Sequence, residues 1–304
     1  MEKFEIHILG CGCAIPTKRH NPSAQIVNIR EKLFMVDCGE GTQLQMRFQK
    51  LRFANLRSIF ISHLHGDHCF GLLGLISSFA LLGRTADLHV YAPRDYETLF
   101  QEQLNFFCKG MDFSVIFHPI NTTIYQAIYE DHSVTIYTLP LDHRIPCCGF
   151  LFKEKPTLPH ILRDMIDFYQ IPVSQINNIK NGADWTLDDG TVIPNKRLTR
   201  PAEKVRSYAY CADTAYKPDL KRYLENITLL YHEATFGEDR LERAKNTHHS
   251  TARQAATLAR DCHVGKLLIG HYSAHYLDEN CLLQEACEIF PNTIASNEGM
   301  IIKL

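Results

Sequence analysis

Four side chains that can bind a metal ion follow directly after a short apolar segment, residues 59–61. They are His63, His65, Asp67 and His68. Such polar groups are costly to bury without a partner, and imidazole nitrogens and carboxylate oxygens are ligands that suit Zn²⁺. The pattern predicts a metal site where a buried strand ends, and it constrains the fold more than any other feature of the chain.

The spacing within this cluster divides it between two ions. In an extended or turning segment alternate side chains share a direction, so we expect His63 and His65 to bind one ion. Asp67 and His68 lie past a turn that Gly66 leaves the backbone free to make, and they can face a second ion. A histidine-rich surface loop would explain a single H-x-H pair, but the full H-x-H-x-D-H pattern after an apolar strand favours the metal site.

Further ligands are expected at the ends of other strands, because four side chains cannot satisfy two ions. The candidates each follow a predicted strand: Asp142 and His143 come after residues 133–138, Asp213 comes after residues 208–212, and His271 comes after residues 266–270. Taken singly, a residue of this kind is more often structural than a ligand. As a set that completes a two-metal site, a ligand role is the better interpretation.

The resulting assignment gives each ion three ligands of its own and the pair one bridging carboxylate. His63, His65 and His143 bind the first ion, Asp67, His68 and His271 bind the second, and Asp213 bridges them. Two ions about 4 Å apart lower the pKa of bound water and neutralise charge that develops during hydrolysis. Asp67 can also orient or deprotonate that water. Asp37, at a predicted strand end, is either a hydrogen-bond partner of a ligand histidine or a helix N-terminal carboxylate, and the sequence leaves both open.

Short apolar strands alternate with helical segments along most of the chain, which predicts an α/β fold of sheets covered by helices. Helices are expected near residues 42–53, 70–82, 94–107 and 251–260. With 304 residues, 45% of them hydrophobic, the chain can bury a sizeable core.

The composition favours a protein of the reducing cytoplasm. No basic region followed by an apolar stretch opens the chain, and the most apolar run, residues 70–82, is too short to span a membrane. The 11 cysteines are scattered without a CxxC pair, so they do not predict a disulfide framework. The formal net charge is −2, so any basic charge that contacts a polyanion must be concentrated locally.

Between Lys153 and Arg206 the alternation breaks, and the segment has five prolines and little apolar periodicity. A loop this long inside a domain is usually functional or disordered, so we interpret it as an insertion in the main domain. Its last part is locally basic, with Lys196, Arg197, Arg200, Lys204 and Arg206. Phosphate contacts of these residues would be salt-sensitive and sequence-independent, and a solvated charged loop is the alternative.

The metal-binding cluster is the signature of the metallo-β-lactamase-like hydrolases, and further motifs resemble the ribonuclease Z branch. These motifs are D-C-G-E-G-T-Q at residues 37–43, H-L-H-G-D-H at 63–68, H-E-A-T at 232–235, H-S-T at 249–251 and G-H-Y-S at 270–273. The resemblance covers essentially the whole chain. It implies one catalytic domain over residues 1–304, an αβ/βα four-layer sandwich, with residues 153–206 as an inserted flexible arm.

The resemblance also implies the activity, a zinc-dependent endoribonuclease that removes 3′ trailers from precursor tRNA. It would hold two Zn²⁺ per subunit and cut after the discriminator base, leaving a 3′-hydroxyl on the tRNA and a 5′-phosphate on the trailer. A homodimer is implied, in which the arm grips the tRNA elbow from the partner subunit. His249 would stand by the scissile phosphate, steadied by Glu233. From the residues alone, His249 precedes Ser250, a plausible N-cap, and a solvent-facing histidine would be the alternative.

Two stretches depart from the family pattern. Residues 170–174, Q-I-P-V-S, stand where the arm usually has a Gly-x-Pro-centred stretch, and His20 precedes Asn21 where arginine is usual.

Two other functions are weighed against the endonuclease: a hydrolase of small phosphodiesters or (thio)esters, and a non-catalytic tRNA-binding scaffold. The intact ligand set argues against the scaffold, and the arm together with His249 argues against the small-molecule hydrolase.

Overall fold

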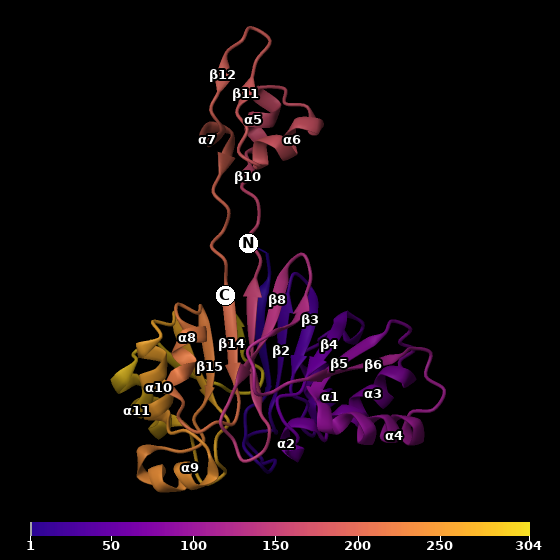
Figure 1. Cartoon of the computed structure of the whole chain (residues 1–304), viewed down its shortest axis with the longest axis vertical. Helices are drawn as coiled ribbons and strands as arrows, with labels where there is room; N and C mark the ends of the chain where they lie inside the picture. The colour runs from indigo at the N-terminus through magenta and orange to yellow at the C-terminus, as the bar shows by residue number, and fades with distance from the viewer. Residues whose placement is uncertain (1) are drawn as a thin grey trace. The chain divides into compact units, whose positions relative to one another are not determined.

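The computed structural model describes residues 2–304, which divide into two compact units. The larger unit contains residues 2–153 and 206–304, and the smaller one contains residues 154–205. Two seven-stranded sheets form the larger unit (Figure 1). Within residues 2–304, no helix is long and apolar enough to cross a bilayer.

The first sheet has the strand order β18-β1-β2-β3-β4-β5-β6. Its strands are β1 (Phe4–Gly10), β2 (Ala24–Ile29), β3 (Lys32–Val36), β4 (Leu56–Phe60), β5 (Leu88–Pro93), β6 (Val115–Ile120) and β18 (Ile301–Lys303). β1 to β3 pair antiparallel, whereas β3 to β6 run parallel. The helices α1 (Thr42–Phe48), α2 (Gly66–Cys69), α3 (Leu72–Leu81) and α4 (Glu97–Phe107) come from the same part of the chain.

The second sheet has the order β17-β16-β15-β14-β9-β8-β7. Its strands are β7 (Ala127–Glu130), β8 (Val134–Pro140), β9 (Cys148–Glu154), β14 (Ser207–Cys211), β15 (Leu229–Glu233), β16 (Lys266–Gly270) and β17 (Thr293–Ala295). β14 to β17 run parallel. The helices α8 (Lys221–Leu224), α9 (Leu241–Thr247), α10 (Ala252–Asp261) and α11 (Asn280–Ile289) belong to this half.

The main core lies between the two sheets. Phe34 and Phe60 of the first sheet approach Phe152 and Phe150 of the second, with ring centroids 6.1 Å and 5.5 Å apart. Figure 1 shows α1, α3 and α4 beside the first sheet and α8, α10 and α11 beside the second. Helix, sheet, sheet and helix therefore stack in four layers, because each sheet buries one apolar face against the other sheet and one against helices.

The helix expected over residues 42–53 is shorter than predicted, since α1 ends at Phe48. Lys50 has a left-handed φ of 54°, which stops the helix, and a separate short turn follows at Phe53.

The carboxyl ends of β3, β4, β14, β15 and β16 lead into the polar residues singled out from the sequence. Polar residues in the loops that follow parallel strands meet at one edge of a sheet, which is where α/β folds place their sites.

The inserted segment contains more regular structure than its sequence predicted. It holds the helices α5 (Arg163–Phe168), α6 (Val173–Lys180) and α7 (Asn195–Leu198), and the two-residue strands β10 (His160–Ile161), β11 (Trp185–Thr186), β12 (Val192–Ile193) and β13 (Thr199–Arg200). Four buried side chains form a core of its own: Ile171, Ile179, Ile193 and Leu198. Elements this short carry too few residues to show a hydrophobic period.

Candidate metal centre

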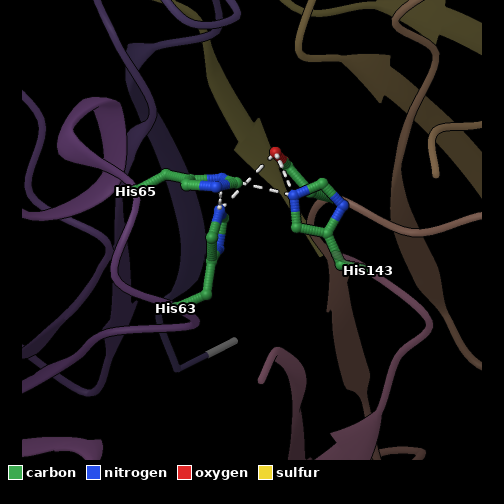
Figure 2. A group of neighbouring side chains, drawn as sticks. His63, His65 and His143 are labelled. Atoms are coloured by element: carbon green, nitrogen blue, oxygen red, sulfur yellow. Dashed lines mark hydrogen bonds and ion pairs between the residues drawn. The ribbon is translucent and has the colours of Figure 1, made fainter. Parts of the chain in front are cut away.

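The first group of predicted ligands converges on one point, as Figure 2 shows for three imidazole rings. Nδ1 of His65 lies 3.1 Å from Nε2 of His63 and 3.2 Å from Nε2 of His143. One carboxylate oxygen of Asp213, Oδ2, lies 3.6 Å from Nε2 of His63 and 3.8 Å from Nε2 of His143. Three nitrogens and one oxygen thus surround a common centre, an arrangement suited to a tetrahedral ion.

The second group meets the other oxygen of the same carboxylate. Oδ1 of Asp213 lies 3.1 Å from Nε2 of His271 and 3.4 Å from Nε2 of His68. Oδ2 of Asp67 lies 3.5 Å from Nε2 of His68 and 3.7 Å from Nε2 of His271. The structure therefore brings all seven sequence-predicted ligands together, and Asp213 directs one oxygen at each group. Whether they bind metal stays a prediction.

The donor atoms fit a pair of cations. Oδ1 of Asp213 is buried and accepts no well-aligned hydrogen bond, although it lies 3.1–3.4 Å from the ring nitrogens of His271 and His68. A carboxylate in the interior needs compensating charge or donors. The ring nitrogens face one another across 3.1–3.4 Å, where neutral imidazoles cannot each find a donor. Cations at the two centres would satisfy both requirements at once.

A partner holds the second nitrogen of four of the five histidines. Nδ1 of His63 lies 2.9 Å from Oγ of Ser62, Nδ1 of His68 lies 2.7 Å from Oδ2 of Asp37, Nδ1 of His143 lies 3.0 Å from the carbonyl of His248, and Nδ1 of His271 lies 2.9 Å from Oγ1 of Thr235. Such partners fix the ring orientation and leave the other nitrogen free for a metal. Each free nitrogen is the one that faces the centre.

Asp37 resolves the alternative that the sequence left open. Its carboxylate accepts hydrogen bonds from the main-chain and side-chain groups of Ser62 at 2.7 Å and 2.9 Å, from Nδ1 of His68 and from the hydroxyl of Tyr210 at 2.8 Å. The residue has a positive φ of 56°, which is uncommon outside glycine and turns the chain sharply after β3. Asp37 is therefore a hydrogen-bond partner that positions the predicted ligand His68.

The three histidines of the first group are held neutral. Burial lowers the pKa of His63 well below its ordinary value, and the charge of His68 lowers it further. Burial also lowers the pKa of His65 and that of His143, despite the opposing charge of Asp213. Neutral imidazoles present a free lone pair, which is the form that binds a metal.

The second group has the opposite electrostatics. Burial alone would lower the pKa of His68 and of His271, but the nearby charge of Asp213 outweighs it and raises both well above the ordinary value. Burial would likewise raise the pKa of Asp213, but the charges of His271 and His68 hold it well below its usual range. This side of the centre therefore requires positive charge, which protons or a metal ion can supply.

Asp67 is held by the loop that follows β1. The main-chain N–H of Ala14 donates to Oδ2 of Asp67 at 2.7 Å. Burial alone would raise the pKa of Asp67, but its interaction with His271 and the charge of His68 lower it. The carboxylate is therefore ionised and fixed in direction beside the second group.

His249 and Glu233 form a buried pair beside the metal-binding groups. Nδ1 of His249 lies 2.8 Å from Oε1 of Glu233, and its ring centroid lies 5.1 Å from that of His143 and 5.5 Å from that of His271. Burial lowers the pKa of His249, but the charge and hydrogen bond of Glu233 raise it more. Glu233 also accepts from the main-chain N–H and the hydroxyl of Thr235. A fixed, proton-carrying imidazole thus adjoins the cluster.

The cap of the helix after His249 differs from the prediction. Thr251, not Ser250, is the N-cap of α10, because its hydroxyl accepts from the N–H of Gln254 while the Gln254 side chain accepts from the N–H of Thr251. Ser250 instead donates to the carbonyl of Thr214 at 2.8 Å. His249 is 7% exposed, so it is no solvent-facing bystander.

Sequence reasoning missed the groups that support the ligands. Thr235 contacts Glu233, His249 and His271 through one hydroxyl. The main-chain carbonyl of His248, the residue before His249, accepts from Nδ1 of His143. A main-chain carbonyl carries no residue signature, and a hydroxyl is too common to stand out. Only the position of Thr235 inside the H-E-A-T motif gave a signal.

Known proteins resemble the chain over its whole length. A Bacteroides thetaiotaomicron protein named ribonuclease Z is 58% identical over 304 residues, covering 100% of this chain and 96% of the relative. The chain belongs to the ribonuclease Z family. A ribonuclease Z of Porphyromonas gingivalis is 49% identical, with both chains covered completely. A family model described as the anti-Pycsar protein Apyc1 also matches, over residues 4–158.

Solved structures confirm the expected fold of this ribonuclease Z family member. The short form of human tRNase Z superposes with a TM-score of 0.71 at 21% identity, covering 98% of each chain. The metallo-β-lactamase fold protein YhfI of Bacillus subtilis gives a TM-score of 0.71 at 18% identity, covering 100% of each chain. The prediction of a metallo-β-lactamase-like four-layer α/β sandwich is therefore confirmed.

Proposed function

We propose that this chain is a metal-dependent endoribonuclease that removes 3′ trailers from precursor tRNA. The cut falls after the discriminator base and leaves a 3′-hydroxyl on the tRNA and a 5′-phosphate on the trailer. The observation that carries the proposal is the His249–Glu233 pair, 2.8 Å apart, beside two converging groups of metal-binding side chains in a ribonuclease Z family chain. The cytoplasm is the compartment where such a substrate and the reduced cysteines belong.

Two Zn²⁺ per subunit are the proposed cofactors. The first ion would be held by His63, His65 and His143, and the second by Asp67, His68 and His271. Asp213 would be a ligand of both ions, and the donor positions support this division. When bound, the pair supplies positive charge against the phosphodiester and lowers the pKa of a water molecule. Elemental analysis of the purified protein should find about two zinc ions per subunit, from the number of complete donor groups. A metal-free active protein would contradict the proposal.

Two proton transfers are assigned to residues of the chain itself. Asp67, fixed by the Ala14 N–H, orients the attacking water and accepts its proton. His249 donates a proton to the 3′ oxygen of the tRNA as it leaves, and Glu233 keeps the imidazole in place and charged. Asp67→Ala should therefore abolish cleavage of both tRNA and small phosphodiesters, because it removes an orienting base and a ligand together.

The insertion, residues 154–205, is proposed as a tRNA-binding exosite. Lys196, Arg197 and Arg200 are exposed while the intervening Leu198 is buried in the insertion's own core, so the cationic side chains face solvent. Arg206, expected from the sequence to belong to this basic set, is instead buried and donates to the carbonyls of Glu2 at 2.9 Å and Leu304 at 3.1 Å. Phosphate contacts here would be independent of sequence and weakened by salt.

A homodimer is proposed as the working form, following the family resemblance. Large apolar side chains stand exposed on α1 and just after α2, with Phe48 66% and Phe70 70% accessible, and Leu44 half exposed. Leu44 and Phe48 lie one turn apart on α1, and exposed apolar residues of this size are typical of association surfaces. Phe48→Glu should shift the sedimentation of the protein from dimer to monomer, whereas an unchanged dimer would exclude α1 from the interface.

The runner-up function, hydrolysis of small phosphodiesters or (thio)esters, has two comparisons in its favour. The Apyc1 family model covers residues 4–158, and the fold is also that of a diphosphatase of the PhnP family, with a TM-score of 0.65. The insertion lies almost entirely outside that match. The second alternative, a tRNA-binding scaffold without catalysis, requires a defective ligand set, and the seven donors are all in place.

The decisive experiment is incubation with a 3′-extended tRNA transcript, with and without a chelator, followed by mapping of the cut end. We expect one chelator-sensitive cut after the discriminator base. Deletion of residues 157–200 should abolish this cut while a small chromogenic phosphodiester is still hydrolysed, because the metal centre lies in the other unit. Intact tRNA cleavage after the deletion would remove the exosite proposal, and a protein active only on the small substrate would establish the runner-up.

A further inference from the structure

A second cluster of metal-binding side chains lies outside the metal centre. Sγ of Cys11 is 3.3 Å from Nδ1 of His20 and 3.7 Å from Oε2 of Glu298, and Nδ1 of His20 is 2.9 Å from the same carboxylate oxygen. Cys11 is fully buried and His20 is 6% exposed. The three donors come from the end of β1, the following loop and the C-terminal segment, so folding alone brings them together.

The spacing of these donors matches that of the first metal-binding group. There the neighbouring donor atoms lie 3.1–3.8 Å apart, and here they lie 2.9–3.7 Å apart. Tetrahedral zinc with ligands at about 2.0–2.3 Å has its donors roughly 3.3–3.7 Å from one another. Thiolate, imidazole and carboxylate are three of the ligand types that zinc prefers.

The surroundings of His20 resemble those of a metal-binding histidine. Its other nitrogen, Nε2, contacts the carboxylate of Glu279, which Arg19 also contacts. A carboxylate on the far nitrogen fixes the ring and strengthens it as a ligand. The other oxygen of Glu298 accepts from the N–H of Asn21 at 2.8 Å, so this carboxylate is also held in direction.

We propose that Cys11, His20 and Glu298 bind a third Zn²⁺, separate from the pair at the metal centre. Binding replaces the thiol proton and the proton on Nδ1 of His20 by one divalent ion, and the two protons leave to solvent, so the buried cluster keeps its net charge. A hydrogen-bonded network would make poor use of the thiol, which is a weak donor, whereas the thiolate is a strong zinc ligand.

The cluster adjoins a cavity through His20, and an ion bound there would have a structural consequence. A cavity of about 230 Å³ opens beside His20 and is lined by Gly12, Arg19, Tyr272 and Glu279. A cation here would tie the loop of residues 12–20 to the C-terminal segment. Because the N–H of Ala14 in that loop donates to Asp67, the third zinc would hold in place a support of the metal centre.

The test uses cobalt as a probe, because sulfur ligation has a spectroscopic signature. The full-length protein is stripped of metal under reducing conditions and titrated with Co²⁺ while near-ultraviolet absorption is recorded. We expect a thiolate-to-cobalt charge-transfer band in the unsubstituted protein and its loss in Cys11→Ser, which should bind about one equivalent less. The seven donors of the metal centre are nitrogen and oxygen, so failure of the proposed nuclease function would leave this band in place.

Cys13→Ser is the matched control, because Cys13 is a nearby thiol whose side chain interacts with His271 of the metal centre. It should keep the band. Loss of the band in Cys13→Ser but not in Cys11→Ser, or no thiolate band in the unsubstituted protein, overturns the proposal. Glu298→Gln, which leaves the sulfur in place, should release cobalt to a competing chelator at least about tenfold more readily, and an unchanged affinity also overturns it.

Discussion

The carboxylate of Asp37 accepts four hydrogen bonds in the core, one of them from the ring of His68. Asp37→Asn would replace one acceptor oxygen by an amide that donates, so the tautomer of His68 would no longer be fixed. We expect zinc affinity to fall about 10–100-fold while the fold is kept. Competition with a chromogenic chelator measures this affinity.

Tyr210→Phe is the graded control for that variant, because it removes only the hydroxyl that donates to Asp37. It should weaken zinc binding far less than Asp37→Asn. Equal zinc affinity in Asp37→Asn and the unsubstituted protein would show that the position of His68 does not depend on this carboxylate.

His249 is expected to act on the rate of the chemical step. His249→Ala should lower kcat on precursor tRNA by about 10²–10⁴-fold with little change in KM, because it removes a proton donor and leaves the insertion intact. Steady-state kinetics separates the two constants. His248→Asn should cost far less, since the group that holds His143 is a carbonyl and asparagine tolerates the left-handed φ of 54°. A matching loss in both variants would argue against a specific role of His249.

At the level of elements, the strands that precede the predicted metal ligands could be predicted from the sequence, because an apolar run followed by a polar residue marks the end of a buried strand. The ends of β4, β8, β14 and β16 all follow this rule. The insertion was not predictable in detail, because its four strands have two residues each and its core joins residues as distant as Ile171 and Leu198. In the same way, the ligands could be read from residue types, while the Ser62 hydroxyl and the His248 carbonyl depend on tertiary position alone.

The turn between β7 and β8 gives a pH-dependent prediction. Asp131 accepts from Lys32 Nζ at 2.5 Å, from both Ser133 donors at 2.7 Å and from the Val134 N–H at 3.0 Å. Burial would raise the pKa of Asp131, but these hydrogen bonds lower it. The carboxylate therefore stabilises the fold above its unfolded pKa of about 4, and this contribution is lost as pH falls.

Asp131→Asn should accordingly lower the free energy of unfolding by roughly 1–2 kcal/mol at pH 7, and the difference from the unsubstituted protein should shrink towards pH 4 and below. Urea unfolding of both proteins at each pH measures it. A difference that stays constant with pH would mean that the charge of Asp131 contributes nothing.

At the scale of the whole molecule, the metal centre joins the two sheets. His63 follows a strand of the first sheet, whereas Asp213 and His271 follow strands of the second. Removing zinc with a chelator should therefore lower the Tm of the entire larger unit. Relative to the metal-free protein, zinc present at a thousand times its Kd should stabilise the folded state by about 4 kcal/mol. Calorimetry with Asp213→Asn, which should show little response to the chelator, is the control. An unchanged Tm would exclude this coupling.

The pairing of β18 with β1 has a consequence for whether either half of the chain can fold alone. The last strand of the chain completes the sheet built from its beginning, while β7, β8 and β9 from the first half complete the sheet of the second. Either half alone would leave a sheet with an unpaired edge strand, which promotes aggregation, and would contain only part of the predicted ligand set. Neither half is therefore expected to fold without the other, whereas residues 154–205 have a small core of their own.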